Sequence, residues 1–284
     1  MPPSMKIPKL SPSDVEAAYV SAQKVVEVHR RIAGWLKPGL TLAAIDLWIG
    51  KTLEDLGCTS CFRNYVTPGH APFPSHACLS VNECIVHGHA LSSVAPVKEG
   101  DLVKIDIGVS HRGWIGDAGW TYCLGTPTDL QRRLMNCGKE ALRRGVATIG
   151  PSAKLSEFAK AVQNHVEKEC GFHCVHGLGG HGYGRSLHGP PFVANAMPTL
   201  MDAPWHEGKE FWVPGTLVAV EPMIGVGTGK TKELPHPFNR RWSDWPIYTA
   251  DGSLSVHYEH DVLVTESGHR VLTEGLDAIP DIIG

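Results

Sequence analysis

The feature that most limits the fold of this chain is a helical pattern that occurs twice. In the first copy, a helix capped by Ser11 or Ser13 runs to about Trp35 and is followed by a Pro-Gly break. A second helix covers residues 41–56, where apolar side chains recur every three or four positions, and a glycine ends it.

The second copy repeats this order later in the chain. After Asp129 the sequence has a helix, a Gly-Pro break and a second helix that ends at Gly171. Each copy is followed by apolar alternation and glycines, which are typical of strands and turns. The repeat predicts one α+β domain made of two related halves, residues 11–125 and 126–284, which share one sheet and one cleft.

The composition is that of a soluble globular protein: 284 residues, a net charge of −3, 19% charged and 42% hydrophobic residues. The basic residues are dispersed, so no nucleic-acid partner is expected. The chain lacks the apolar run of about 18 residues that a membrane span requires and the apolar core of a signal peptide. We therefore expect a cytoplasmic protein, with a flexible arm at residues 1–10 and long loops at 191–215 and 225–250.

Eight cysteines would suggest disulfides in a small secreted domain, but in a cytoplasmic chain of this length we expect free thiols. Cys58 and Cys61 form a C-x-x-C pair, and Cys170 and Cys174 have another short spacing. These four could nominally form a thiolate zinc site. We favour the alternative that they are small buried side chains near two helix ends.

Two aspartates interrupt segments that otherwise have the pattern of buried strands, in KIDIGVSHRGWIGDAGWTY. If residues 110–113 form a four-residue hairpin loop, Asp106 and Asp117 lie directly opposite each other, with Cβ atoms about 4.5 to 5.5 Å apart. Like charges placed in this way destabilise a sheet. A shared proton, a basic partner or a bound cation would relieve the repulsion, and the hairpin alone does not decide among them.

Three further segments place a candidate metal ligand in an apolar or glycine-rich setting. His181 lies in GGHGYG, Glu221 follows the apolar run LVAV, and Glu259 lies just before the run DVLV. Such residues are more often structural, but little polar alternation surrounds them. Two aspartates, two glutamates and one histidine suit two divalent cations such as Mn²⁺, Fe²⁺ or Co²⁺ better than a thiolate zinc site. Two such ions can hold a bridging hydroxide and polarise a carbonyl, which is hydrolytic chemistry.

Five motifs in order resemble the type I methionine aminopeptidases over nearly the whole chain from about residue 12: FPSHACLSVNECIVHG, KIDIGV with GDAGWTY, GGHGYG, VEPM and HYEHDVLV. The resemblance implies the pita-bread fold, an α+β fold in which two pseudo-symmetric halves have a central antiparallel sheet covered by helices. Residues 11–284 would then form a single catalytic domain.

The resemblance also implies two metal ions and five ligands. One metal would be bound by Asp117, His181, Glu221 and Glu259, and the other by Asp106, Asp117 and Glu259. Asp117 and Glu259 would therefore bridge the two ions. In this family a hydroxide between the metals is the nucleophile, and the residue that matches Glu221 passes a proton from water to the leaving amine.

The implied reaction removes the N-terminal methionine from nascent proteins and peptides whose second residue is small. His87 matches a histidine that contacts the substrate near the scissile peptide bond. His188 matches one that hydrogen-bonds the substrate carbonyl and stabilises the oxyanion. We expect a monomer that meets its substrates as peptides or as nascent chains at the ribosome. By position, the candidates for the methionine pocket are Phe73, Cys78, Met223 and Trp245.

Four residues near this pocket depart from the pattern of bacterial family members: Thr67, His70, Phe73 and Leu187. None is a proposed ligand, so they put strict methionine preference in question and leave hydrolysis as predicted. Two alternatives stay open. One is a related peptidase of Xaa-Pro specificity, although such relatives usually carry an additional amino-terminal domain. The other is an inactive binding module, although inactive members typically lose ligands that are all present here.

Overall fold

The computed structural model describes residues 10–199, 203–236 and 243–284. The arm predicted for residues 1–10 therefore lies outside the described part, apart from Leu10. None of the helices in that part combines the length and apolar character needed to cross a bilayer. The helices are α1 (Pro12–Ala33), α2 (Leu42–Asp55), α3 (Asp129–Val146), α4 (Leu155–Gln163), the π-helical turn η1 (Asn164–Glu169) and the 3₁₀ turn η2 (Glu207–Lys209).

Side-chain caps explain where three of these helices begin. The Ser11 hydroxyl accepts a hydrogen bond from the Asp14 N–H at 3.2 Å, and the Asp14 carboxylate accepts one from the Ser11 N–H at 3.0 Å. Thr41 caps α2 by accepting from the Ala44 N–H, and Thr128 caps α3. Both predicted helix pairs are present.

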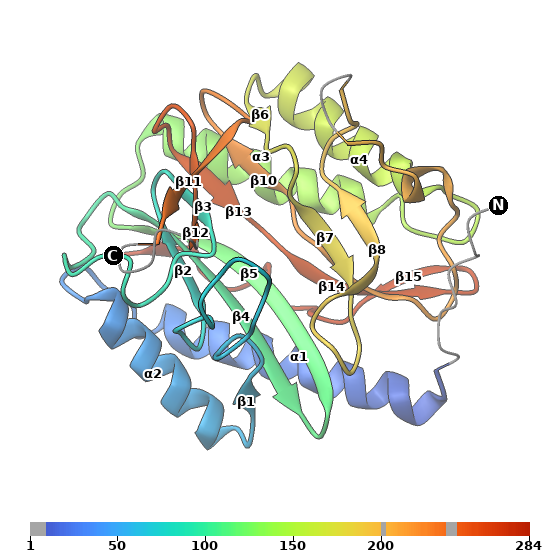
Figure 1. The fold of residues 1–284 in the computed structure, drawn as a ribbon, viewed down its shortest axis with the longest axis horizontal. Coiled ribbons are helices and arrows are strands. Elements are labelled where there is room, and N and C mark those ends of the chain that lie inside the picture. Colours follow the sequence, from blue (N-terminus) through green and yellow to red (C-terminus); the bar gives the residue numbers. More distant parts are fainter. Residues whose placement is uncertain (1–9, 200–202, 237–242) are drawn as a thin grey trace.

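The strands of the described residues are numbered along the chain as in Figure 1. They are β1 (Thr59–Ser60), β2 (Cys78–Val81), β3 (Cys84–Val86), β4 (Leu102–His111), β5 (Trp114–Leu124), β6 (His173–Cys174), β7 (Gly179–Gly182), β8 (Gly189–Ala194), β9 (Leu217–Val220), β10 (Met223–Gly225), β11 (Thr231–Pro235), β12 (Ser243–Thr249), β13 (Ser255–His257), β14 (His260–Thr265), β15 (Gly268–Val271) and β16 (Ile282–Ile283).

Two five-stranded sheets form the centre of the molecule. One has the order β1-β4-β5-β16, with β2 also paired to β4, and the other has the order β15-β14-β9-β7-β8. Two three-stranded sheets, β13-β10-β6 and β11-β12-β3, complete the strand layer. Among the strand pairs described, only β16 and β5 are parallel. The two larger sheets meet where the Glu259 N–H donates to the Gly119 carbonyl oxygen at 2.8 Å.

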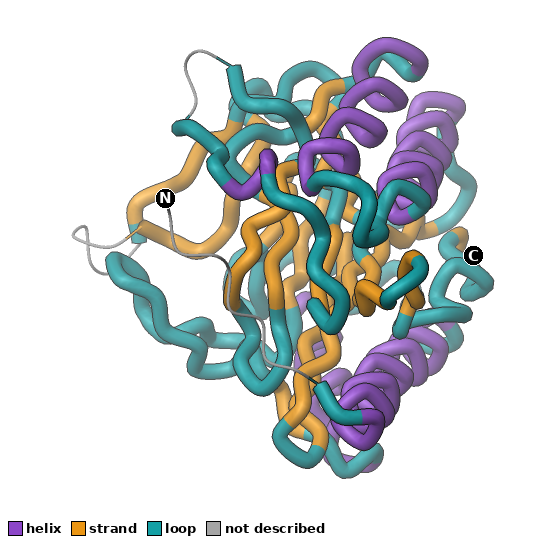
Figure 2. Tube along the Cα trace, turned by 90° about the vertical axis from the view of Figure 1, so that its right-hand side faces the viewer, coloured by secondary structure: helices purple, strands orange, loops and turns teal. Residues whose placement is uncertain are grey.

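The helices cover one side of this strand layer. Figure 1 shows α1 and α2 along one edge of the molecule and α3 and α4 along the other, with the strands between them. In Figure 2, which is turned by 90°, all four α-helices lie on one side of the strands and long loops lie on the opposite side. Side chains that point away from the helices therefore point toward the loops.

Helix α1 packs closely against strand β5. His29, which is fully buried in α1, hydrogen-bonds the Tyr122 hydroxyl through Nδ1 at 2.9 Å and the Ala118 carbonyl oxygen through Nε2 at 3.1 Å. A Cβ at Gly116 would lie 2.6 Å from backbone atoms of Ser21. Only glycine permits this approach, so the helix and the strand hold each other at a fixed distance.

The turn between β4 and β5 is shorter than predicted. His111 pairs with Trp114, so the loop is the two-residue turn Arg112-Gly113 and not a four-residue loop over 110–113. Arg112 and Gly113 both have positive φ, 51° and 77°. A two-residue type I′ turn requires this conformation at both positions, and glycine adopts it without strain.

The shorter turn changes which residues face each other. Asp106 pairs with Gly119, and Asp117 pairs with Gly108. The prediction that the two aspartates are directly opposed is therefore wrong. They lie on the same face of the hairpin as diagonal neighbours, with each carboxylate opposite a glycine.

The prediction of a long loop over residues 225–250 is also wrong. This segment contains the end of β10 and all of β11 and β12, and β12 pairs with both β11 and β3. Pro235 lies in β11, an edge strand, where a proline removes no ladder hydrogen bond. In 191–215, the described residues include only the end of β8 and the short turn η2 as regular structure.

All eight cysteines are free, as predicted. Among the described residues, the groups of side chains close enough to share a metal ion include neither Cys58 nor Cys61. The nominal four-thiolate zinc site is therefore not formed. Cys170 belongs to a different group, with Cys137 and His165.

Candidate active site

The β4–β5 hairpin projects two carboxylates into space that glycines leave open. Asp106 and Asp117 each begin an Asp-x-Gly sequence, and the pairing places each aspartate opposite the glycine of the other. A Cβ at Gly119 would lie 2.8 Å from the His257 ring and 3.1 Å from the Glu259 carboxylate. The missing side chain at Gly119 therefore lets two side chains of the second half approach Asp106.

Three predicted ligands come from the second half. His181 lies on β7, Glu221 directly follows β9, and Glu259 lies between β13 and β14. His181 Nε2 is 3.9 Å from Asp117 Oδ2 and 3.8 Å from Glu221 Oε1. All five predicted ligands, including Asp106, line one cavity.

The carboxylates of this cavity lie close together and are shielded from solvent, so they repel one another strongly. Burial, with a further contribution from the charge of Glu221, raises the pKa of Asp106 to about 8. Burial first, and then neighbouring carboxylates, also raises the pKa of Asp117, Glu221 and Glu259 well above the ordinary range. Without positive charge nearby, these groups would have to bind protons.

This donor set fits divalent cations. The Oδ1 atoms of Asp106 and Asp117 are buried and have no hydrogen-bond partner. Two groups, Asp117 with His181 and Glu259, and Asp106 with His257 and Glu259, have ligand atoms within 4.8 Å of one another. Carboxylate and imidazole donors suit Mn²⁺, Fe²⁺, Co²⁺ and Zn²⁺. A cation would satisfy the orphaned oxygens and offset the repulsion.

Sequence reasoning missed two residues of this centre. His257 Nε2 lies 3.3 Å from Glu221 Oε2 and 3.8 Å from Glu259 Oε2. Asp261 accepts a hydrogen bond from the Asp117 N–H through Oδ2 at 2.8 Å. Alternation could have found both, because residues 257, 259 and 261 are spaced two apart and so favour the same face of a strand.

Two of the predicted histidines, His87 and His188, line the same cavity as the candidate metal ligands. His87 has the left-handed backbone conformation, φ 58°, which is uncommon for a residue with a side chain. Burial first, and then the nearby charges of His188 and His70, lower its pKa to about 4. His188 is exposed, and its Nδ1 shares a hydrogen bond of 2.6 Å with the hydroxyl of Tyr65, which sequence reasoning also missed.

The cavity that the carboxylates line has a volume of about 140 Å³ in total, and one side of it is an apolar recess. Phe73 meets the edge of Trp245 with ring centroids 5.3 Å apart, and Trp245 Nε1 donates to the Ala71 carbonyl oxygen at 2.7 Å. An apolar cavity of about 150 Å³ holds a group the size of benzene, so the cavity as a whole is on the scale of one side chain. Its apolar lining is Phe62, Tyr65, Phe73, Cys78, Leu187 and Trp245.

Met223, the fourth predicted pocket residue, does not line this recess. It lies in a separate apolar cluster with Ile85, Val86, Val175 and Ile247. Sequence position alone could not separate the two clusters, because Met223 is only two residues from Glu221.

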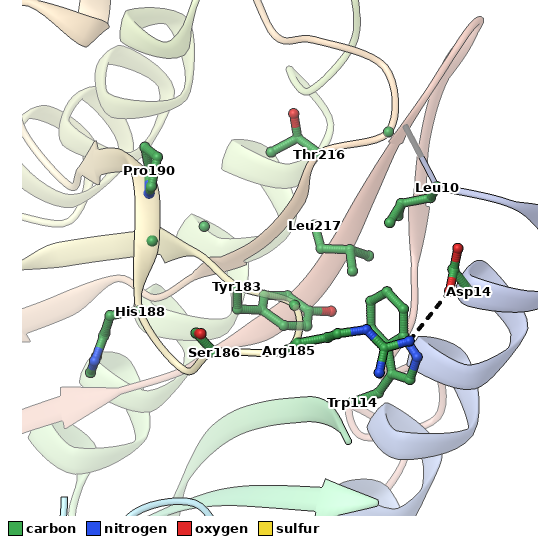
Figure 3. A pocket seen from close by; sticks show the side chains of 14 residues that line it. Leu10, Asp14, Trp114, Tyr183, Arg185, Ser186, His188, Pro190, Thr216 and Leu217 are labelled. Atoms are coloured by element: carbon green, nitrogen blue, oxygen red, sulfur yellow. Dashed lines mark ion pairs between the residues drawn. The ribbon is translucent and has the colours of Figure 1, made fainter. Parts of the chain in front are cut away.

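A second cavity of about 470 Å³ adjoins the first and shares His188 with it. Figure 3 shows its residues, which come from the segments around β7, β8 and β9, from the start of α1 and from Trp114 at the start of β5. At its far end Arg185 lies over the Trp114 ring, 4.6 Å from the centroid, and pairs with Asp14 at 3.7 Å. The wider cavity therefore borders the active-site cavity at His188.

Four carboxylates and an imidazole that fit divalent cations, in one cavity with an apolar recess, define a metal-dependent hydrolase. The chain belongs to Metallopeptidase family M24, whose sequence profile matches residues 17–266.

Similar proteins agree with this assignment. A methionine aminopeptidase from Aquifex aeolicus is 32% identical over 95% of this chain and 100% of that protein. The crystal structure of methionine aminopeptidase from Rickettsia prowazekii has a TM-score of 0.82 and 26% identity, and the match covers 94% of this chain and 100% of that one. The predicted pita-bread fold is thereby confirmed.

A more distant structure shares only the fold. An Xaa-Pro dipeptidase from Bacillus anthracis has a TM-score of 0.70 and 21% identity. The match covers 93% of this chain but 61% of the dipeptidase.

Proposed function

We propose that this chain is a methionine aminopeptidase, which removes the N-terminal methionine from peptides and nascent proteins with a small second residue. The observation that carries the proposal is a single cavity of about 140 Å³ in which an apolar recess adjoins the candidate metal ligands. The full-length similarity to methionine aminopeptidases supports the same specificity. The thioether of a methionine side chain packs well against aromatic rings and a thiol. Phe73, Trp245 and Cys78 provide these groups.

In this proposal two divalent cations are held by Asp106, Asp117, His181, Glu221 and Glu259. Bound divalent cations supply Lewis acidity toward a carbonyl oxygen and lower the pKa of water. The short distances from His181 Nε2 to the carboxylates of Asp117 and Glu221 support this assignment, and so does the presence of Glu259 in both ligand groups. Mn²⁺, Fe²⁺ and Co²⁺ are the candidates.

The protein's own groups then move protons and orient the substrate. The Glu221 carboxylate accepts a proton from the attacking water and delivers it to the nitrogen of the leaving amine. His188 donates a hydrogen bond to the substrate carbonyl oxygen as negative charge develops there. His87 lines the same cavity and contacts the substrate next to the scissile bond.

The free thiols support a reducing compartment, since cysteines of cytosolic proteins stay reduced. We propose a cytoplasmic monomer that meets nascent chains, at the ribosome or after release. Size-exclusion chromatography with light scattering tests the monomer. Sedimentation with ribosomes tests the contact at the ribosome.

One assay tests the activity against its alternatives. Metal is removed with a chelator, Mn²⁺, Co²⁺ and Fe²⁺ are restored separately, and cleavage of Met-Gly, Leu-Gly and Xaa-Pro peptides is followed. Metal-dependent release of methionine is expected. Preferred cleavage of Xaa-Pro would replace the proposal by the other specificity, and no cleavage with any metal would indicate a binding module.

A further inference from the structure

A second group of metal-binding side chains lies between α3 and η1. It consists of Cys137 in α3, His165 in η1 and Cys170 just after η1. One ligand atom from each lies within 4.8 Å of the others. Cys170 Sγ is 3.4 Å from His165 Nε2. A tetrahedral zinc ion with ordinary Zn–S and Zn–N bonds separates these atoms by roughly 3.6 Å.

The other nitrogen of His165 is already oriented. Its Nδ1 lies 3.0 Å from Glu169 Oε2. Arg144 Nη1 in turn donates to both oxygens of Glu169 at 2.8 Å. A histidine that binds a metal usually donates its second N–H to a carboxylate, which fixes the ring and leaves the first nitrogen free as a ligand. His165 has this arrangement.

The π-helical turn explains why His165 and Cys170 are neighbours. The Cys170 N–H donates to the His165 carbonyl oxygen at 3.0 Å, which is a bond over five residues. An ordinary α-helix bonds over four residues, and its wider π form occurs mostly as single turns at functional sites. The extra residue in the turn brings the imidazole and the thiol together.

The group is accessible from outside. A cavity of about 380 Å³ reaches Cys137, His165 and Cys170, and Glu169 and Arg133 also line it. None of these residues lines the active-site cavity.

We propose that Cys137, His165 and Cys170 form a second metal site, for a thiophilic ion of the Zn²⁺ type. Two thiolates and an imidazole prefer such an ion, whereas the carboxylate-rich active site accepts harder ions. Three protein ligands leave the fourth position to water from the cavity. The ion ties α3 to η1 and so stabilises the helical layer of the second half.

Cobalt binding tests the site, because cobalt bound to thiolates has an absorption band that cobalt bound only to carboxylates lacks. Purified protein is stripped of metal and titrated with Co²⁺, and the near-ultraviolet absorption of thiolate-to-cobalt charge transfer is followed. We expect this band in the wild-type protein and its loss in the double variant Cys137→Ser/Cys170→Ser, with one fewer cobalt bound per chain. The control variant Cys58→Ser, which removes a thiol elsewhere, should keep the band. Absence of the band in the wild type, or its persistence in the double variant, overturns the proposal.

A milder variant covers the case in which the double variant does not fold. Glu169→Gln changes a half-exposed side chain and weakens the orientation of His165. Loss of such an outer partner typically lowers metal affinity by about 10- to 100-fold. The affinity is measured by competition with a chromogenic chelator, with Glu167→Gln as the control in the same turn. An unchanged affinity in Glu169→Gln overturns the site as proposed.

Discussion

His257 Nε2 lies 3.3 Å from Glu221 Oε2, yet the imidazole does not neutralise this carboxylate. Burial lowers the pKa of His257 to about 3, so the ring is neutral at physiological pH. It also has no hydrogen bond at Nε2. The charge of Glu221 must therefore be offset by a cation or by a proton, and both belong to the proposed reaction.

Replacing Glu221 by glutamine removes the proposed proton carrier and keeps the shape of the side chain. We expect kcat for a Met-Gly peptide to fall by at least ~10², because general acid–base catalysis contributes about this factor. The measurement is steady-state kinetics at saturating metal, with metal content determined on the same samples. Near-normal kcat in Glu221→Gln would remove this residue from the proton pathway.

Replacing Gly119 by alanine tests the space that His257 and Glu259 occupy. The new Cβ would lie 2.8 Å from the His257 ring, so the ring and the carboxylate must move. We expect weaker metal binding, measured by calorimetry, and lower activity. Gly268→Ala is the matched control, because a Cβ there meets no atom within 4 Å. Equal metal affinity in the two variants would contradict this account.

Replacing His188 by alanine removes the proposed hydrogen-bond donor to the substrate carbonyl. The expected loss in kcat is ~10²-fold, the cost of removing one oxyanion donor. Metal content should stay unchanged. Tyr65→Phe removes only the bond that orients His188 and should cost about tenfold or less. Loss of metal from His188→Ala would make this histidine a ligand instead.

Replacing Phe73 by leucine shortens one wall of the apolar recess. We expect kcat/KM for Met-Gly to fall by about 10-fold and the ratio of Phe-Gly to Met-Gly cleavage to rise, since a change of pocket size of this kind shifts discrimination by about 10- to 200-fold. Phe158→Leu, in the core of α4, controls for general loss of packing. An unchanged ratio would exclude Phe73 from the specificity pocket.

Replacing His29 by glutamine should weaken the pH dependence of the free energy of unfolding. Burial lowers the pKa of His29 to about 4, while an unfolded histidine has a pKa of about 6.5. Between these values the unfolded chain binds the extra proton, so the free energy of unfolding falls as the pH decreases from 6.5 to 4, on the order of 3 kcal/mol in total.

Urea unfolding of wild type and His29→Gln at pH 4 to 7, both with the same metal, measures this difference. His173→Gln, at an exposed histidine, controls for the loss of an imidazole. If the free energy of unfolding changed with pH equally in wild type and His29→Gln, the lowered pKa of His29 would be contradicted.

Much of the site could be predicted because its donors interrupt apolar segments. Asp106, Asp117, His181, Glu221 and Glu259 stand out in the sequence, and the structure brings all five to one cavity. The paired helices were equally visible, since caps and glycines mark their ends.

The errors have a common physical origin, which is strand geometry. The register of β4 and β5 depends on whether Arg112 and Gly113 both adopt positive φ, and an arginine in this conformation is not expected from sequence. Strands β11 and β12 were hidden because prolines and tryptophans interrupt their alternation. Met223 was misplaced because nearness in sequence to Glu221 does not determine which side of a short strand a residue faces.

The position of the candidate ligands in the chain has a consequence for folding during synthesis. Asp106 and Asp117 lie in the first half, and His181, Glu221 and Glu259 lie in the second. A chain that has emerged only as far as β5 offers two carboxylates and no imidazole partner, so it cannot hold the ions tightly. Metal binding contributes to stability only once distant segments have come together, and the candidate ligands span residues 106–259. The ions would then bind only after both halves have folded, and they would stabilise the contact between the halves. Tight metal binding would distinguish the fully folded protein from a partly folded one.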